Sequence, residues 1–199
     1  MTVVALVLAA GAGRRMGGPK ALVRPRPGAP TLLEAAVGRV RAAGCDEVVV
    51  VVGAEASAAG DVARATGARV VEATGWDEGM GASLRAGLDA LTSGAEDAEV
   101  ALVTLVDLPD VGPDVLARVL DAADGPATLA RATYAGTPGH PVLLGRHHWA
   151  PVRDSATGDR GAREYLRVTD HRLVECGDLA TGRDVDTVDD LRRSDAADA

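Results

Sequence analysis

The segment LAAGAGRRMGGPKAL, residues 8–22, combines glycines with basic side chains directly after a short apolar run. Glycines let backbone amides approach an anion closely, because they carry no Cβ atom. Arginine and lysine add charge-assisted hydrogen bonds to such an anion. The residues concerned are Gly11, Gly13, Gly17, Gly18, Arg14, Arg15 and Lys20. The segment therefore predicts a phosphate-binding loop.

This loop fits neither of the two common phosphate-loop patterns. After Gly11 and Gly13, the third glycine of a dinucleotide fingerprint comes one residue too late, at Gly17. Pro19 precedes Lys20, and an alanine follows where a P-loop has a metal-binding serine or threonine. A phosphate loop of a third kind remains, with a glycine-rich turn and incidental arginines as the alternative.

A carboxylate follows a second apolar run, in LVTLVDLPDV. Asp107 stands at the end of this run, and Pro109 ends the strand just beyond it. A carboxylate at the carboxyl end of a buried parallel strand is well placed to hold a divalent cation near phosphates. Capping of a turn is the alternative, and the presence of the glycine loop favours the metal.

Two further segments carry candidate ligand-binding residues. In GWDEGMGASLRAGL, Gly79 and Gly81 precede or open a helix whose first turn holds Ser83, so exposed amides there could contact a base or ribose. In GRDVDTVDDL, Asp184 and Asp186 alternate along an extended stretch and share one face, so one of them could be a second metal ligand. Helix capping is the alternative for both segments.

The second half of the chain holds His140 between a glycine and a proline, and Asp159 close to Arg163 in GDRGAREYL. A histidine in such a glycine setting is a candidate functional residue, with a structural role as the alternative. Asp159 could equally cap the helix that follows.

Composition narrows the class of ligand. The net charge is −8, yet no acidic residue precedes Glu34, so positive charge is concentrated in the loop. Aromatic residues make up 2% of the chain, which argues against stacking of nucleic-acid bases, and the net charge argues against binding a phosphate backbone. A small anionic ligand is favoured, with no nucleic acid and no membrane as partner.

Cys45 and Cys176 lie far apart and outside any metal-binding spacing, so neither a disulfide framework nor a zinc site is expected. The apolar run from Val3 to Ala10 is too short to span a membrane and lacks a basic flank. We therefore expect a cytoplasmic protein.

Apolar strand patterns alternate with helical patterns along the first 123 residues, and shorter strands and a short helix follow. This alternation predicts an α/β fold with a mostly parallel central sheet and helices on both faces. We expect one domain over residues 1–192 and a disordered tail over residues 193–199.

The motifs, taken in order, resemble those of the MobA-like nucleotidyltransferases. The match runs from Val4 to about Leu191 through LAAGAGRRMGGPKAL, GMGASLRAGL, LVDLPDV, GTPGHPVLL, GDRGAR and DVDTVDDL. The GHP and GD-x-GAR elements are most similar to the MocA-type molybdenum cofactor cytidylyltransferases. The resemblance implies the Rossmann-like nucleotide-diphospho-sugar transferase fold.

The resemblance also implies roles for individual residues. Lys20, Arg15 and Asp107 would be catalytic, with Mg²⁺ or Mn²⁺ held by Asp107 and by Asp186, or else Asp184. His140, Asp159 and Arg163 would face the acceptor. The nucleotide would be bound by Leu8, Ala9, Ala10, Gly11, Gly13, Arg14, Arg15, Lys20, Gly79, Gly81 and Ser83.

The implied reaction transfers CMP from CTP to the terminal phosphate of molybdenum-loaded molybdopterin and releases pyrophosphate. The acceptor phosphate is already an anion, so alignment and charge neutralisation suffice and no strong general base is needed. The alternatives are GTP as donor, another phosphorylated acceptor such as a sugar or alcohol phosphate, or a nucleotide-binding chaperone that delivers the cofactor to a molybdenum enzyme.

Overall fold

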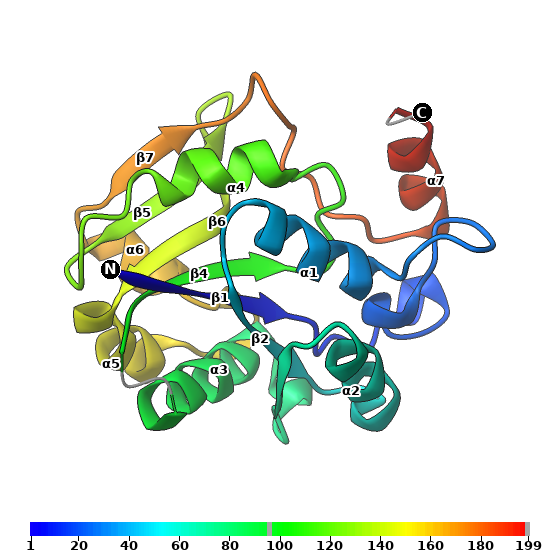
Figure 1. The fold of residues 1–199 in the computed structure, drawn as a ribbon, viewed down its shortest axis with the longest axis horizontal. Coiled ribbons are helices and arrows are strands. Elements are labelled where there is room, and N and C mark those ends of the chain that lie inside the picture. Colours follow the sequence, from blue (N-terminus) through cyan, green and yellow to red (C-terminus); the bar gives the residue numbers. More distant parts are fainter. Residues whose placement is uncertain (95–96, 198–199) are drawn as a thin grey trace.

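A central sheet runs through the protein, with helices on both sides (Figure 1). The computed structural model describes residues 1–94 and 97–197. Within these residues, seven strands join one sheet in the order β3-β2-β1-β4-β6-β5-β7. They are β1 (Thr2–Leu8), β2 (Glu47–Val52), β3 (Arg69–Glu72), β4 (Ala98–Leu105), β5 (Leu129–Tyr134), β6 (Thr137–Gly145) and β7 (Arg172–Glu175).

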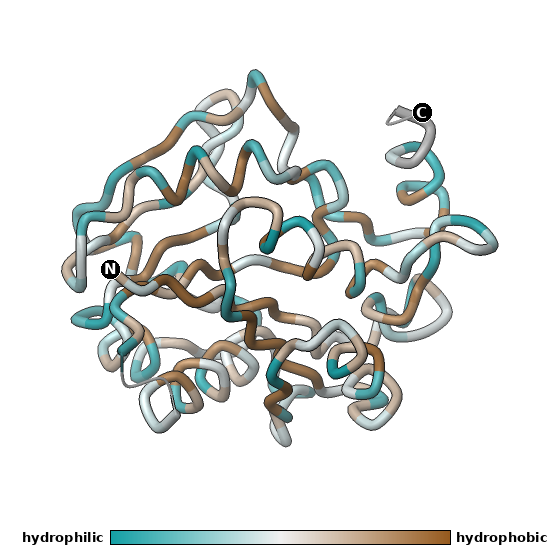
Figure 2. Tube along the Cα trace, in the orientation of Figure 1, coloured by the Kyte–Doolittle hydropathy of each residue, from teal (hydrophilic) through white to brown (hydrophobic). Residues whose placement is uncertain are grey.

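Only β6 runs antiparallel to its two neighbours, while all other neighbouring strands pair in parallel. The mostly parallel sheet predicted from the apolar runs is therefore confirmed. The central strands are the most hydrophobic part of the chain, because both faces of the sheet are covered (Figure 2).

Each face of the sheet has its own apolar core. Helices α1, α2 and α4 pack on one face, and α3, α5 and α6 pack on the other. The helices are α1 (Leu32–Ala42), α2 (Ala56–Ala65), α3 (Met80–Gly94), α4 (Pro113–Leu120), α5 (Arg146–Ser155), α6 (Arg163–Val168) and α7 (Val188–Ala197), with short 3-10 turns η1 (Arg14–Met16), η2 (Lys20–Leu22), η3 (Trp76–Glu78) and η4 (Gly158–Arg160). None of the described helices combines the length and the apolar character needed to cross a membrane.

Three parts of the structure differ from the sequence prediction. Helix α5 and strand β7 were not expected, because α5 contains Pro151 and β7 is short and largely exposed. Burial of Trp149 and Val152 stabilises α5, and parallel pairing with β5 stabilises β7. Helix α7 continues to Ala197, further than the sequence pattern indicates, and 198–199 lie outside the described residues.

The register of the two central strands sets the position of the site. Leu8 at the end of β1 lies opposite Leu105 at the end of β4, and these strands are neighbours. The glycine loop after Leu8 and the carboxylate of Asp107 therefore leave the same edge of the sheet side by side. In open α/β sheets this edge is where ligands bind.

Candidate functional site

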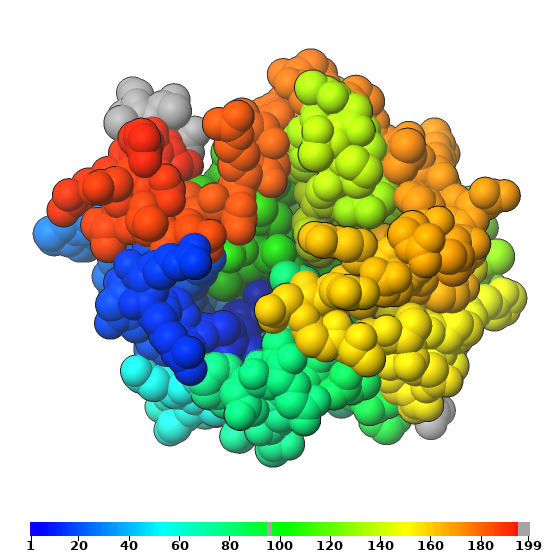
Figure 3. Space-filling view, turned by 180° about the vertical axis from the view of Figure 1, so that it is seen from behind, coloured from blue at the N-terminus to red at the C-terminus, as the bar shows by residue number. Residues whose placement is uncertain are grey.

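A cleft of about 420 Å³ opens at this edge, between the glycine loop and the start of α3. From behind, the molecule is hollowed where the N-terminal segment, the green α3 region and the yellow segment near residue 158 meet (Figure 3). The cleft is lined by Leu8, Ala10, Gly11, Ala12, Gly13, Arg14, Lys20, Trp76, Asp77, Gly79, Met80, Ser83, Leu105, Val106, Asp107 and Asp159. Its size suits a small-molecule ligand.

The glycine loop folds back on itself at Gly13. This residue has a φ of 55°, and its carbonyl accepts a hydrogen bond of 2.7 Å from the Met16 amide. A Cβ atom at Gly13 would lie 2.1 Å from the carbonyl oxygen of Gly18, so only glycine fits. Met16 and Ala21 are buried and anchor the loop, which leaves Lys20 directed toward the cleft.

Lys20 joins two carboxylates that are far apart in the sequence. Its Nζ donates hydrogen bonds of 2.7 Å to Oδ2 of Asp107 and of 2.7 Å to Oδ1 of Asp186. Lys20 and Asp107 are largely buried, whereas Asp186 is half-exposed. Lys20 is also the only lysine in the chain. A compact ammonium group can contact both carboxylates from one point, which suits this position.

The charges of this cluster follow from its surroundings. Burial alone would lower the pKa of Lys20, but the neighbouring carboxylates outweigh it and raise that pKa, so the ammonium stays charged. Burial raises the pKa of Asp107 above the ordinary range, against the opposing effect of Lys20. The hydrogen bond from Lys20 lowers the pKa of Asp186.

Asp186 reaches the site because its segment is tied to the end of β4. The Val185 amide donates a hydrogen bond of 2.9 Å to the carbonyl of Asp107. Arg15 then lies 3.6 Å from the other carboxylate oxygen of Asp186. Neither Asp184 nor Asp186 lines the cleft itself, but Asp186 bonds to Lys20, whereas Asp184 acts only through its charge, which helps to raise the pKa of Asp107. The contact geometry therefore favours Asp186 over Asp184 as partner of Asp107.

The donor set at this point fits a hard divalent cation. Oδ1 of Asp107 is buried and has no hydrogen-bond partner among the described residues. Those residues contain no group of three or more histidine, cysteine, aspartate or glutamate side chains that could hold a metal ion. Mg²⁺ is usually held by one or two carboxylates together with substrate phosphates and water. Asp107 and Asp186 would supply the protein part of such a set.

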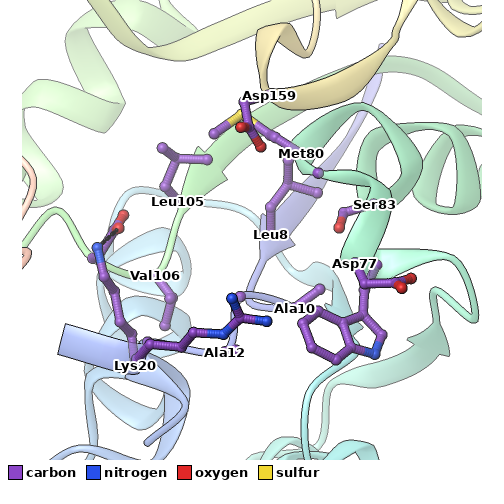
Figure 4. Close-up of a pocket in the computed structure, with 16 residues that line it drawn as sticks. Leu8, Ala10, Ala12, Lys20, Asp77, Met80, Ser83, Leu105, Val106 and Asp159 are labelled. Carbon is purple, nitrogen blue, oxygen red and sulfur yellow. Dashed lines mark hydrogen bonds and ion pairs between the residues drawn. The ribbon is translucent and has the colours of Figure 1, made fainter. Parts of the chain in front are cut away.

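The opposite wall of the cleft is formed by the start of α3 and by η4. In Figure 4, Ser83 and Asp77 lie across the cleft from Lys20, and Asp159 lies beside Met80. Gly79 has a φ of 116°, and a Cβ atom there would lie 2.5 Å from Oδ1 of Asp159. Close packing of η4 on α3 therefore requires glycine at this position, and it brings Asp159 into the cleft.

Most residues predicted to bind the nucleotide do line the cleft, but some do not. Gly81 packs against the backbone of Thr157, where a Cβ atom would lie 2.8 Å from its amide nitrogen. Arg15 is exposed and, among the described residues, is connected to the site by its ion pair with Asp186. The predicted residues outside the cleft lining are Ala9, Arg15, Gly81, Asp184, Asp186, His140 and Arg163.

Trp76 lines the cleft and was missed by sequence reasoning. A Cβ atom on Gly53 would lie 2.5 Å from the side chain of Trp76, so the indole packs directly over that glycine. Aromatic residues are rare in this sequence, since Trp76 is one of two tryptophans and the chain has no phenylalanine. This rarity was the signal that could have marked Trp76 as a candidate site residue.

His140 lies outside the cleft, on β6, and is partly buried. Burial, followed by the charges of Arg131 and Arg163, lowers the pKa of His140 to about 4. The imidazole is therefore neutral at physiological pH. Arg131 was not singled out from the sequence, because an arginine within a strand pattern gives no signal of its own.

Together, the parallel sheet, the glycine loop at its edge and the paired carboxylates define a nucleotidyltransferase of the nucleotide-diphospho-sugar transferase fold. Residues 5–175 match the MobA-like NTP transferase domain, and the chain belongs to this family. The predicted family and fold are confirmed.

Three individual proteins illustrate the similarity. The nicotine blue oxidoreductase of Paenarthrobacter nicotinovorans is 36% identical over 203 residues, which cover 96% of this chain and 95% of that protein. A nucleotidyl transferase from a species of Methanothermobacter is 28% identical, with a TM-score of 0.76 over 98% of this chain and 97% of that chain. The Rv0371c protein of Mycobacterium tuberculosis in complex with manganese is 31% identical, with a TM-score of 0.72 over 98% of both chains.

Proposed function

We propose that this protein transfers CMP from CTP to the terminal phosphate of molybdenum-loaded molybdopterin, with Mg²⁺ as cofactor. The observation that carries the proposed chemistry is the meeting of Lys20, Asp107 and Asp186 beside the glycine loop. The choice of CTP and of molybdopterin is supported by the sequence motifs in both halves of the chain. Pyrophosphate is the second product.

The protein's own residues would act by binding and by neutralising charge. The glycine-loop amides, Arg14 and the charged Lys20 would hold the triphosphate. Ser83 and the Gly79 backbone, in the opposite wall of the cleft, would contact the base and ribose. The acceptor phosphate is already anionic, so the transfer needs in-line alignment and not a strong base. Arg15 would add positive charge beside Asp186.

A divalent cation at Asp107 and Asp186 would neutralise charge on the triphosphate and on the leaving pyrophosphate. The structure of the Rv0371c protein in complex with manganese supports the proposal that this chain binds a divalent ion. His140, Asp159 and Arg163 would lie on the acceptor side, where Asp159 already lines the cleft.

Pyrophosphate release tests the reaction directly. Purified protein is incubated with Mg²⁺, each NTP in turn and molybdenum-loaded molybdopterin. We expect release with CTP, a large loss in Lys20→Ala, and unchanged release in the surface control Arg64→Ala, because Arg64 is exposed on α2 and pairs with the exposed Asp61. Absence of release with every NTP would refute the proposal, and release with GTP alone would correct the donor.

Nucleotide binding is tested separately by thermal unfolding with and without Mg²⁺. A ligand present at about 100 times its Kd stabilises the folded state by about 2.7 kcal/mol. We expect CTP with Mg²⁺ to raise the Tm of the wild type and of Arg64→Ala, and to raise that of Lys20→Ala less. Equal shifts in all three proteins would exclude Lys20 from the phosphate site.

A second candidate function is an oxidoreductase activity, favoured by the relative named as nicotine blue oxidoreductase. Such an activity would need an electron donor, and a reduced nicotinamide dinucleotide would suit a cleft that binds phosphates and has Trp76 in its wall. Consumption of NADH or NADPH with a quinone-like dye, in the absence of any NTP, would support this function over nucleotidyl transfer.

A further inference from the structure

Two basic side chains lie near each other beside the cleft. Leu129 belongs to the core under α5 and α6, and strand alternation places Arg131 on that same face. His140 lies in the irregular part of β6, where the pairing with β5 shifts register, next to Gly139, whose carbonyl accepts a hydrogen bond of 3.2 Å from Arg131. Arg131 lies opposite Val142 in the pairing of β5 with β6. These two residues therefore form one patch near the edge of the sheet where the cleft opens.

Arg163, at the start of α6, completes this patch. Helix α6 packs on the same face of the sheet as Leu129, and, in addition to burial, the charge of Arg163 at its first position lowers the pKa of both Arg131 and His140. The segment leading to Arg163 comes directly from the cleft, where it contributes Asp159. The three residues Arg131, His140 and Arg163 are called the Arg131 cluster below.

The positive charge of the Arg131 cluster is not balanced by the protein. Within residues 1–94 and 97–197, neither of its arginines forms an ion pair with a carboxylate, whereas Arg167 on the same helix as Arg163 pairs with Glu164. The Arg131 guanidinium donates one hydrogen bond, of 3.2 Å, to the carbonyl of Gly139. Its Nε is buried and has no hydrogen-bond partner in the described part of the chain.

This arrangement is costly unless an anion is present. A partly buried guanidinium without a carboxylate loses hydration and gains no compensating charge. Burial, followed by the charge of Arg163, lowers the pKa of Arg131, which shows the same cost. In a chain of net charge −8, carboxylates are abundant, yet among the described residues none forms an ion pair with Arg131 or Arg163.

We propose that the Arg131 cluster binds the phosphate monoester group of the acceptor beside the nucleotide cleft. Two guanidinium groups match the oxygens of a phosphate dianion, and the neutral imidazole of His140 can donate a further hydrogen bond. This inference rests on the proposed function for the source of the phosphate. The anion site itself rests on the cluster alone.

Inorganic phosphate serves as the probe, added to full-length protein saturated with Mg²⁺ and a non-hydrolysable CTP analogue. NMR of the histidine rings, with His140→Gln for assignment, measures the pKa of His140. A bound anion favours the imidazolium, so we expect saturable binding that raises this pKa from about 4 by at least about one unit. His171, whose ring contacts the Thr169 carbonyl, serves as an internal control.

Variants assign the effect to the cluster. Arg131→Met and Arg163→Met should each weaken phosphate binding by about tenfold or more, whereas Arg167→Met should bind as the wild type does. Since Arg163 is exposed, Arg163→Met tests the site even where Arg131→Met fails to fold.

The proposal is overturned if phosphate does not shift the pKa of His140 in the wild type, or if both cluster variants bind phosphate as tightly as Arg167→Met. Phosphate binding without any NTP turnover would leave the anion site in place and refute the proposed function. Nucleotidyl transfer without phosphate binding would refute the anion site and leave the proposed function in place.

Discussion

Replacing Lys20 by methionine keeps the length of the side chain but removes the ammonium group between Asp107 and Asp186. The Lys20 and Asp107 side chains are 15% and 16% exposed, and their charged atoms lie 2.7 Å apart. Asp186 is 47% exposed, so solvent already screens its charge. Most of the cost of Lys20→Met should therefore come from leaving Asp107 buried without a partner.

The magnitude follows from this difference in burial. Breaking a fully buried pair costs about 3–5 kcal/mol, and an exposed pair contributes about 0–1 kcal/mol. Because solvent reaches part of this site, we expect Lys20→Met to lower the free energy of unfolding by about 2–4 kcal/mol. Asp186→Asn should cost less than about 1 kcal/mol.

A double-mutant cycle measures the pair itself. Asp107→Asn removes the buried charge, so the double variant Lys20→Met/Asp107→Asn should be more stable than the sum of the single effects implies. We expect a coupling energy of about 2 kcal/mol, measured by urea unfolding monitored by circular dichroism. Arg64→Met, an exposed charge, is the matched control and should change stability by less than about 0.5 kcal/mol.

The pH dependence gives an independent check. Without Lys20, burial and Asp184 raise the pKa of Asp107 in the folded state above its unfolded value. A carboxyl group whose pKa is raised by folding lowers the free energy of unfolding once the pH rises above its unfolded pKa of about 3.9. The deficit of Lys20→Met should therefore shrink as the pH falls toward that value.

Since Lys20 is the only lysine, a ¹³C-lysine label also reports its titration without assignment. Its pKa should lie above 10.5 in the wild type and fall in Asp107→Asn. Additivity of the two substitutions within about 0.5 kcal/mol, together with an unshifted lysine titration, would refute the reasoning.

Three further predictions concern other parts of the site. The pKa of His140 is lowered to about 4 in the folded protein, so as the pH drops from about 6.5 the unfolded chain takes up this proton first and the free energy of unfolding should fall. The fall should be smaller in His140→Gln, and identical pH dependence of stability in the two proteins would contradict this. Trp76 lines the cleft whereas Trp149 is buried, so CTP should alter tryptophan fluorescence in the wild type and not in Trp76→Leu. Gly79→Ala places a Cβ atom 2.5 Å from an Asp159 oxygen at a positive φ and should cost about 1–3 kcal/mol, which a wild-type Tm would contradict.

Much of the fold could be predicted because its main strands are local patterns. Continuous aliphatic runs such as 47–52 predict strands buried on both faces, and their alternation with helices predicts a parallel sheet. Helix α5 escaped prediction because its stability comes from burying Trp149 against a distant core, which no local pattern records. The end of α7 escaped for a related reason, because composition alone indicated a frayed tail.

The candidate site shows the same division. Glycine spacing and the carboxylate after a strand pointed to the loop and to Asp107, because both are short segments with recognisable chemistry. Trp76 was missed because an aromatic side chain in a cleft wall and one in a core cannot be told apart by type alone. Arg131 was missed because an arginine within a strand pattern gives no signal of its own.

By itself, the sequence determined the class of fold, the glycine-rich and basic character of the first loop and the presence of a carboxylate at the end of β4. Each of these depends on neighbours within a few residues. Only the tertiary structure decided between Asp184 and Asp186 as the contact of Lys20, because that choice depends on the hydrogen bond that ties Val185 to Asp107. It alone also brought Arg131, His140 and Arg163 together, since strand register and helix packing join segments that the chain keeps apart.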